Sequence, residues 1–251
     1  MPGHVLITGA SSGIGAALAR AYAAPGVRLT LSGRDAARLA ESAALCRAQG
    51  AEAAPEVVDA SDAAAMAAWI AAADALRPLD LVIANAGIAA PAGRGPERAA
   101  RMQQTFAVNL AGVINTVEPA IPLMAARRRG QIAVMSSLAG FRGLPGAVAY
   151  SASKAAVKAY GEALRGELAP LGIAVSVVCP GFVRSRITDA NRFPMPFFME
   201  AERAAAIIRR GLARKRARIA FPFPLHAAMW LLAALPPAVA DRLLVRLPRK
   251  E

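Results

Sequence analysis

The 251-residue chain has few cysteines, histidines, aromatic residues and acids, and each shortage excludes a class of protein. Two cysteines, Cys46 and Cys179, are too few for a disulfide-rich secreted domain, so we interpret both as small core or surface thiols. Two histidines, His4 and His226, stand far apart in the sequence and predict no metal site. Aromatic residues make up 5% of the chain, and 17 acidic residues oppose 30 lysines and arginines, for a net charge of +13.

The basic excess indicates an attraction to anionic partners, of which nucleic acid is one class. The sequence contains no recognised nucleic-acid module, and its arginines fall largely on predicted helical faces, so we do not expect nucleic-acid binding. No signal peptide is visible, because the first ten residues already form a predicted strand and a glycine turn. We therefore expect a cytoplasmic protein.

Short apolar runs alternate with longer helical stretches along most of the chain. The predicted strands are 4–7, 27–32, 53–58, 81–84, 131–135, 173–178 and 218–221. The predicted helices are 16–24, 36–49, 63–76, 98–127, 148–168 and 201–212, the fourth broken near Pro119 and Pro122. This order predicts an α/β fold in which helices cover both faces of a doubly wound parallel sheet, with three layers. We expect one domain over residues 1–221 and a helical extension over 222–251.

Residues 8–15 read Thr-Gly-Ala-Ser-Ser-Gly-Ile-Gly and lie between the first predicted strand and helix. Gly9 permits a tight turn, Gly13 lets the backbone approach a pyrophosphate, and Gly15 lets the helix pack closely on the sheet. The helix N-terminus then offers free N–H groups and a positive dipole end to phosphates. This segment predicts a dinucleotide site, although its glycine spacing differs from the common G-x-G-x-x-G.

Tyr150 and Lys154 are four residues apart on a predicted helix and therefore share a face. Because a nearby ammonium group favours phenolate, we expect Lys154 to lower the pKa of Tyr150. Such a tyrosine transfers a proton near neutral pH, as the interconversion of a carbonyl and an alcohol requires. Ser137, thirteen residues before Tyr150, is predicted to bond to the same oxygen, with Ser136 as the alternative.

Together these motifs resemble the short-chain dehydrogenase/reductase family over residues 4–221. Residues 8–15 resemble its cofactor motif, Asn85-Ala86-Gly87 its Asn-Ala-Gly motif, and Pro180-Gly181 the turn after its sixth strand. The resemblance implies a Rossmann-type domain in which a nicotinamide carries the hydride. The implied catalytic residues are Asn109, Ser137, Tyr150 and Lys154.

The roles of several residues follow only from the resemblance. Asn109 is implied to hold a water in a proton relay, and its alternative is an asparagine that bonds to neighbouring backbone. Asp59 resembles an adenine-contacting aspartate, with a turn aspartate as the alternative. Lys154 is implied to bind the nicotinamide ribose, and Ser185 stands where many relatives have a threonine that touches the cofactor amide. The predicted cofactor-binding residues are Thr8, Gly9, Ser11, Ser12, Gly13, Ile14, Gly15, Arg34, Asp59, Asn85, Ala86, Gly87, Tyr150, Lys154, Pro180, Gly181, Val183 and Ser185.

The choice between NADP and NAD depends on the residues after the second predicted strand. Gly33 stands where an NAD-selective relative has an acid for the ribose hydroxyls, and the guanidinium of Arg34 suits a 2′-phosphate. Asp35 is better placed as the N-cap of the next helix. Ser12 stands in the glycine motif where some NADP-dependent relatives carry a basic residue. We expect NADP(H), with NAD(H) as the alternative.

The segment 182–200 is expected, by the resemblance, to form a lid over the site. Its residues 193–199 read Phe-Pro-Met-Pro-Phe-Phe-Met and predict an adaptable apolar wall, hence a hydrophobic carbonyl or alcohol substrate. The alternative is a lid that packs on its own protein. A non-catalytic dinucleotide sensor or membrane-associated scaffold is the alternative function, against which the Ser-Tyr-Lys set argues.

The extension 222–251 departs most from the family pattern. Residues 219–240 contain no Asp, Glu, Lys or Arg, and the apolar helix expected at 225–235 is shorter than the ~20 residues that span a bilayer. Residues 201–251 hold eleven basic and three acidic residues, a net charge of +8. This predicts peripheral contact with an anionic membrane, on its inner face, and the alternatives are a wall over the substrate or a subunit interface. Relatives commonly form homo-oligomers through the helical stretches 98–127 and 148–168.

Overall fold

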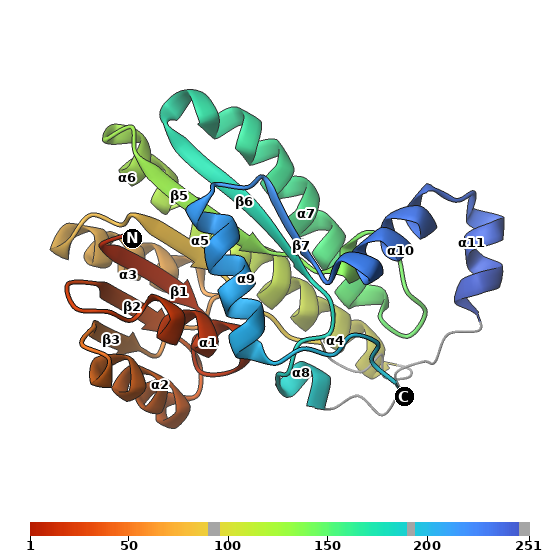
Figure 1. Cartoon of the computed structure of the whole chain (residues 1–251), viewed down its shortest axis with the longest axis horizontal. Helices are drawn as coiled ribbons and strands as arrows, with labels where there is room; N and C mark the ends of the chain where they lie inside the picture. The colour runs from red at the N-terminus through yellow and green to blue at the C-terminus, as the bar shows by residue number, and fades with distance from the viewer. Residues whose placement is uncertain (90–95, 190–193, 246–251) are drawn as a thin grey trace.

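A computed structural model describes residues 1–89, 96–189 and 194–245 (Figure 1). Seven parallel strands form one sheet in the order β3-β2-β1-β4-β5-β6-β7, which confirms the predicted doubly wound sheet. The strands are β1 (His4–Thr8), β2 (Arg28–Ser32), β3 (Glu52–Glu56), β4 (Leu81–Ala84), β5 (Gly130–Met135), β6 (Ile173–Pro180) and β7 (Arg218–Phe221).

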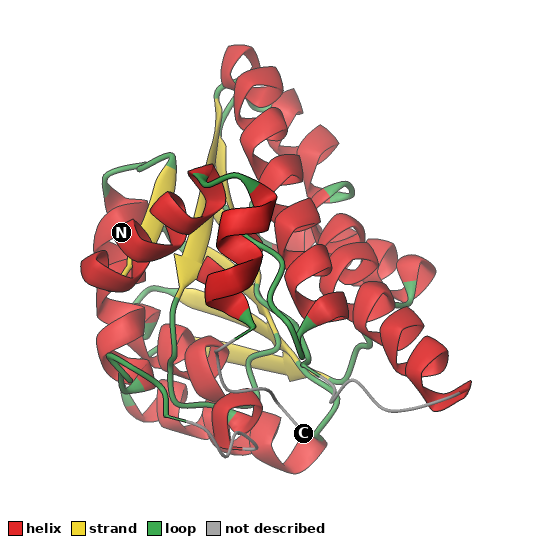
Figure 2. Cartoon of the chain, turned by 90° about the vertical axis from the view of Figure 1, so that its right-hand side faces the viewer, coloured by secondary structure: helices red, strands yellow, loops and turns green. Residues whose placement is uncertain are grey.

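Helices cover both faces of the sheet, so the molecule has three layers (Figure 2). Helices α1, α2 and α9 pack on one face, and α3 to α7 pack on the other. The helical elements are α1 (Gly13–Tyr22), α2 (Ala36–Ala48), α3 (Ala63–Leu76), α4 (Pro96–Phe106), η1 (Ala107–Ala111), α5 (Gly112–Val117), α6 (Ala120–Ala126), η2 (Leu138–Gly140), α7 (Val148–Leu168), η3 (Ala169–Leu171), α8 (Arg186–Asp189), α9 (Ala201–Ala213), α10 (Phe223–Ala234) and α11 (Pro237–Leu244).

The central strands are buried on both sides, as parallel strands between two helical layers must be. In β1 every residue is buried, and successive side chains point to opposite faces. Val5 and Ile7 therefore pack against α1 and α9, whereas Leu6 packs against α3 and α5. This double burial explains why the strands are continuous apolar runs in the sequence.

Two helices begin at aspartates that cap them, and the first of these, Asp35, is the predicted cap. The side chain of Asp35 accepts a hydrogen bond from the N–H of Arg38, and that of Asp62 accepts one from Ala65. The first helix begins earlier than predicted, at Gly13 rather than residue 16. The N–H of Ala16 already donates to the carbonyl of Ser12, so the first helical turn lies within the glycine-rich segment.

The predicted long helix at 98–127 is a chain of four pieces. The break between α5 and α6 falls at Pro119, as predicted, whereas Pro122 lies within α6. Among the described residues, the run Glu97–Ala126 is the one helical stretch long and apolar enough to cross a membrane. Its residues Val113 and Met124 are buried in the core against the sheet, so we interpret it as a core helix of the fold.

The two C-terminal helices lie at one end of the molecule, beyond β7 and α7 (Figure 1). Helix α10, predicted at 225–235, packs on β7 and η2. Helix α11 is joined to the rest by an ion pair of 3.2 Å between Asp241 and Arg142, and its residues Ala240 and Leu244 are buried. The extension is therefore attached to the domain by a few contacts.

Candidate active site

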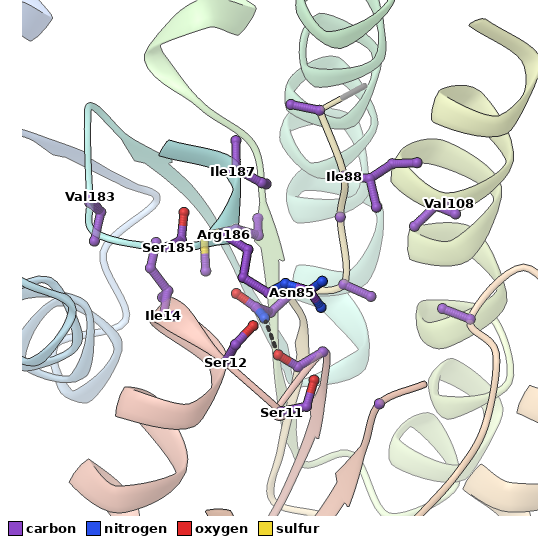
Figure 3. A pocket seen from close by; sticks show the side chains of 18 of the residues that line it. Ser11, Ser12, Ile14, Asn85, Ile88, Val108, Val183, Ser185, Arg186 and Ile187 are labelled. Carbon is purple, nitrogen blue, oxygen red and sulfur yellow. Dashed lines mark hydrogen bonds between the residues drawn. The ribbon is translucent and has the colours of Figure 1, made fainter. Parts of the chain in front are cut away.

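A cavity of about 850 Å³ opens at the carboxyl ends of five strands (Figure 3). Gly9 follows β1, Gly33 follows β2, Asn85 follows β4, Ser136 follows β5 and Gly181 follows β6, and all five line the cavity. Ligands of open parallel sheets bind at this edge, where the strand order reverses. The cavity is therefore the candidate active site.

Most of the predicted cofactor-binding residues line this cavity. They are Gly9, Ser11, Ser12, Gly13, Ile14, Arg34, Asp59, Asn85, Ala86, Gly87, Tyr150, Lys154, Pro180, Gly181, Val183 and Ser185. Thr8 and Gly15 lie behind the wall and shape it. The hydroxyl of Thr8 accepts hydrogen bonds from the N–H groups of Asn85 (3.0 Å) and Ala86 (3.2 Å), and a Cβ added at Gly15 would overlap the carbonyl oxygen of Gly9.

The N-terminus of α1 faces the cavity with its backbone N–H groups. Its first turn contains no acidic residue, and the side chain of Ser12 makes no capping hydrogen bond. Gly13 has a φ of +53°, and a Cβ added there would lie 2.9 Å from Cβ of Ser185. A helix N-terminus with free N–H groups and room for a close approach suits a phosphate group.

Asn85 holds the glycine-rich turn in place. Its side-chain Nδ2 donates to the carbonyl oxygens of Thr8 (3.0 Å) and Gly9 (3.2 Å). Figure 3 shows Asn85 in the cavity wall, close to Ser11 and Ser12. The amide thus joins the end of β4 to the turn after β1 and fixes the floor of the cavity.

Ser137, Tyr150 and Lys154 meet at the far side of the same cavity. Tyr150 is half-buried and accepts a hydrogen bond from the Ser137 hydroxyl, which itself accepts from the N–H of Ala139 (3.1 Å). Lys154 is buried, and its Nζ lies 5.8 Å from the centre of the Tyr150 ring. A phenol, a hydroxyl and an ammonium group thus border one space in which a carbonyl group fits.

The pKa of Tyr150 is shifted in the opposite direction to the one predicted. Burial raises its pKa, because the phenolate loses water, and the hydrogen bond from Ser137 lowers the pKa by less. Lys154 donates to the carbonyl of Met135 at 2.8 Å, and burial lowers the pKa of this lysine to about 8. The predicted lowering of the Tyr150 pKa by Lys154 is therefore wrong in this structure: the ammonium group is directed to the backbone and is itself desolvated.

The two adjacent serines have different surroundings. The hydroxyl of Ser136 donates to the backbone carbonyl of Lys154 at 2.7 Å and so ties β5 to α7. The hydroxyl of Ser137 bonds to Tyr150 and makes a long contact, 3.4 Å, with the carbonyl of Pro180. Ser137 is thus the serine whose hydroxyl lies beside Tyr150, in keeping with the predicted spacing.

Asn109 does not line the cavity. It is buried in the π-helix η1, where its Oδ1 accepts from the N–H of Ile88 (2.7 Å) and its Nδ2 donates to the carbonyl of Ile88 (2.9 Å) and to Ser153 (3.1 Å). These bonds match the alternative of an asparagine bonded to backbone. A Cβ added at Gly87 would lie 3.3 Å from both Asn109 Oδ1 and Lys154 Nζ, so the three groups are close. The water relay stays a prediction.

Arg34 stands exposed at the cavity edge, directly after β2 and Gly33. No ion pair joins it to a carboxylate within the described part of the chain, whereas Arg38 pairs with Asp35 at 3.4 Å. Asp59 lies nearby: the N–H of Ser61 is the main group that lowers its pKa, and Arg34 adds to the effect. Asp59 also accepts from the Ser61 hydroxyl at 2.8 Å, which matches a turn aspartate that lines the cavity.

Sequence reasoning missed part of the wall. Arg186, Ile187 and Thr188 of α8 line the cavity, and Figure 3 shows the Arg186 side chain directed inward, toward Asn85. They lie within the predicted lid 182–200, but the sequence does not single them out, because α8 is a single short turn whose direction depends on its contacts. The other lining residues outside the predicted set are Ser32, Gly33, Asp35, Val58, Ala60, Ile88, Ala89, Val108, Met135 and Ser136.

The predicted apolar lid differs from the structure. Phe197 and Phe198 are exposed and do not line the cavity, and Phe198 packs against Arg184, with its ring centre 5.2 Å from the guanidinium carbon. Met199 is buried and forms a bridge with Val183. Phe193 lies outside the described residues. This side of the cavity is formed by 183 and 185–188 rather than by the aromatic segment.

Comparison with known proteins agrees with this geometry. The family model for short chain dehydrogenases matches residues 3–194. An uncharacterized oxidoreductase of Myxococcus xanthus is 38% identical over 237 residues, covering 94% of each chain. The chain therefore belongs to the short-chain dehydrogenase family.

Two solved structures extend the likeness to the cofactor. A short-chain dehydrogenase from Sphingobium yanoikuyae in complex with NADPH has a TM-score of 0.80 and 27% identity, covering 99% of this chain and 97% of that chain. A short-chain dehydrogenase/reductase from Burkholderia phymatum in complex with NAD has a TM-score of 0.81 and 28% identity, with coverage of 99% and 96%. The family and these neighbours define this protein as an NAD(P)-dependent oxidoreductase.

Proposed function

We propose that this protein is an NADP(H)-preferring reductase that converts an apolar carbonyl compound to its alcohol, with Tyr150 as the general acid. The observation that carries the proposal is the meeting of Ser137, Tyr150 and Lys154 in the cavity that also contains the glycine-rich turn. A binding protein without turnover has no need of a phenol and a serine hydroxyl beside the same empty space.

The residues divide the chemistry between them. A bound nicotinamide cofactor supplies the hydride, since no side chain does. Ser137 donates a hydrogen bond to the carbonyl oxygen and fixes its position, and Tyr150 transfers its proton to that oxygen. Lys154 keeps a positive charge near the phenolate that forms. Asn109 acts from behind the wall, by holding the backbone of Ile88.

The raised pKa of Tyr150 supports the direction of reduction. A phenol with a raised pKa remains protonated at neutral pH and is ready to donate. Oxidation of an alcohol needs the opposite form, the phenolate, which burial disfavours. At neutral pH Tyr150 is therefore in the protonated form that reduction of a carbonyl uses.

The preference for NADP(H) rests on Arg34. Its exposed guanidinium borders the cavity after β2, where a 2′-phosphate of a dinucleotide on this fold is bound. Replacing Arg34 with Ala should raise KM for NADPH by about 10- to 100-fold, the loss of one charge-assisted hydrogen bond, and should leave KM for NADH nearly unchanged. Arg38→Ala is the matched control, because Arg38 pairs with Asp35. Equal effects on both cofactors would remove Arg34 from this role.

The apolar substrate is supported by the wall opposite the glycine-rich turn. Ile88, Val108 and Ile187 line that part of the cavity. Ketones and aldehydes of increasing chain length, compared at saturating NADPH, should show kcat/KM rising with chain length, by up to ~4-fold for each fully buried methylene. A preference for short polar carbonyls would contradict this part of the proposal.

Tyr150→Phe tests the reaction itself. The substitution removes the proton donor, so kcat/KM should fall by about 10²- to 10⁴-fold while the affinity for NADPH, measured by fluorescence titration, is retained. Tyr160→Phe is the control on the same helix, since Tyr160 bonds to Glu118 at 2.6 Å and does not line the cavity. Substantial activity in Tyr150→Phe would refute the assignment, and cofactor binding without turnover by the unaltered protein would favour the sensor alternative.

A further inference from the structure

Helix α10 exposes large apolar side chains on the face that points away from the domain. Phe223, Trp230 and Leu231 are 78%, 60% and 58% exposed. The inner face carries Leu225 and Met229, which are partly buried against the core on the side of the sheet that α3 to α7 cover. No residue of α10 is fully buried, and no charged side chain interrupts either face.

Helix α11 exposes further apolar side chains at the same end of the molecule. It buries Ala240 and Leu244 and exposes Val239 and Leu243, and Val245 follows it with 61% exposure. We call Phe223, Trp230, Leu231, Val239, Leu243 and Val245 the α10–α11 surface. Both helices lie at the same end of the molecule (Figure 1), so the surface is a feature of one region rather than a scatter of single residues.

The length and composition of α10 indicate the kind of partner. Its twelve residues span about 18 Å, short of the ~30 Å hydrocarbon core of a bilayer, so it fits the plane of a lipid surface rather than a crossing. Tryptophan at an exposed helical position suits the interface between lipid headgroups and acyl chains, because its ring is apolar and its N–H finds a polar partner.

Charge distinguishes a lipid surface from a second copy of the chain. The chain carries a net charge of +13, and within the extension 222–251 four basic residues oppose two acidic ones. Asp241, the acid within α11, is already paired with Arg142, whereas Arg242 beside it makes no ion pair with any described residue. Two copies of a chain with a net charge of +13 repel each other, but an anionic lipid surface attracts the chain, by about 1 kcal/mol for each basic residue close to the surface.

We propose that the α10–α11 surface docks this protein on an anionic lipid membrane, with α10 lying in the plane of the interface. The docked helix is close to the cavity: a Cβ added at Gly181, which lines the cavity, would lie 3.0 Å from side-chain atoms of Leu225 and Pro222. Docking therefore holds the cavity near the membrane surface, where apolar molecules concentrate. The docking does not depend on the proposed reaction.

Vesicle co-sedimentation of the full-length protein tests the proposal. The protein should pellet with vesicles of phosphatidylcholine mixed with phosphatidylglycerol, and at least ~10-fold less with phosphatidylcholine alone, since several basic residues contribute. Added salt should weaken the binding, because it screens the attraction. Failure to bind the anionic vesicles at low salt would overturn the proposal.

Two variants distinguish docking through the α10–α11 surface from non-specific adsorption of exposed apolar side chains. The double variant Trp230→Ser with Leu231→Ser should bind anionic vesicles at least ~10-fold more weakly, because two large apolar side chains no longer enter the interface. Leu76→Ser is the matched control, since Leu76 is 71% exposed at the end of α3, and it should bind as the unaltered protein does. Circular dichroism should show both variants folded.

If a second copy of the chain covered the α10–α11 surface instead, the results would differ. Analytical ultracentrifugation would then show a dimer that the double variant dissociates, and vesicle binding would be unaffected by the two serines. That outcome would overturn the membrane proposal. Because none of these readouts is enzymatic, a failed activity assay leaves the test of docking intact.

Discussion

Helices α3 and α10 are both short and apolar, and each contains one tryptophan, yet their tryptophans are in opposite environments. Trp69 of α3 is 5% exposed and Trp230 of α10 is 60% exposed. The large side chains of α3 recur at Met66, Trp69 and Ile70, on one face, and most of its outer residues are alanines. In α10 the large side chains are distributed around the helix. The arrangement of large residues, rather than mean hydropathy, thus determines whether a helix can bury its apolar surface in its own chain.

The domain and the extension each place one kind of side chain in an unfavourable environment. The domain buries the ammonium group of Lys154 beside the candidate catalytic tyrosine, whereas the extension exposes Trp230 and Leu231 to solvent. Each arrangement costs stability in a folded monomer, because a buried charge loses water and an exposed apolar group gains no cover. Such placements are expected at functional sites.

The largest effect on stability is expected for Trp69→Ala. The substitution leaves a cavity between α3 and the sheet, so the free energy of unfolding should fall by about 3–5 kcal/mol. Urea denaturation followed by circular dichroism measures the loss. A loss below about 1 kcal/mol would mean that α3 is not part of the core.

Lys154→Met should change how stability depends on pH. The pKa of Lys154 falls from 10.5 to about 8 on folding, so below pH 8 the folded state bears the full cost of a buried charge. Between pH 8 and 10.5 the folded protein loses this proton before the unfolded chain does, and stability rises with pH by about 3 kcal/mol. Lys154→Met removes this rise.

Thermal unfolding of the unaltered protein and of Lys154→Met between pH 7 and 10 measures the difference in stability, because this range covers most of the pH window in which the lysine loses its proton. Lys158→Met is the control one turn along the helix, where the side chain is half-buried and paired with Glu162 at 3.2 Å. It leaves Lys154 in place and should retain the rise. An identical pH profile for the unaltered protein and Lys154→Met would show that the lysine is not desolvated.

Gly181→Ala tests the contact between the two regions. The added Cβ would lie 3.0 Å from atoms of Leu225 and Pro222, so α10 must shift by a few tenths of an ångström, and overpacking of this kind costs about 1–3 kcal/mol. Gly166→Ala is the control in α7, where a Cβ meets no atom within 4 Å. That change should stabilise the protein by up to ~1 kcal/mol, because alanine favours the helix. Equal effects of the two substitutions would mean that α10 is not held against Gly181.

The smallest effect is expected for Trp230→Ala. The side chain is mostly exposed, so the free energy of unfolding of the soluble protein should change by no more than ~0.5 kcal/mol. Urea denaturation, run beside Trp69→Ala, gives the direct comparison. A loss approaching that of Trp69→Ala would show that Trp230 is covered within the folded monomer.

Much of the fold was predictable because local patterns and the sheet agree. Strands buried on both faces must be apolar runs, and helices between parallel strands must cross to one face or the other, so alternation alone indicates the doubly wound order. Asp35 and Asp62 were recognisable as caps because a free N–H three residues on needs an acceptor. The roles of Gly13 and Gly15 were also predictable, because backbone that approaches a ligand or a neighbouring strand closely leaves no room for a side chain.

Other features depended on contacts distant in the sequence. The pKa of Tyr150 is one, because it reflects burial and the direction in which Lys154 points, and no spacing encodes either. The inward direction of Arg186 and the outward position of Phe197 are others, since each lies in a short connecting segment placed by its neighbours.

Local patterns of residue types were enough to predict the order of elements, the glycine-rich turn, the Ser-Tyr-Lys set and the basic, apolar C-terminal extension. The packed fold was needed to learn which hydroxyl faces the cavity, which carbonyl Lys154 binds and which side of α10 is exposed. Burial and hydrogen-bond partners come from segments far apart in the chain, and these segments meet only when the layers pack.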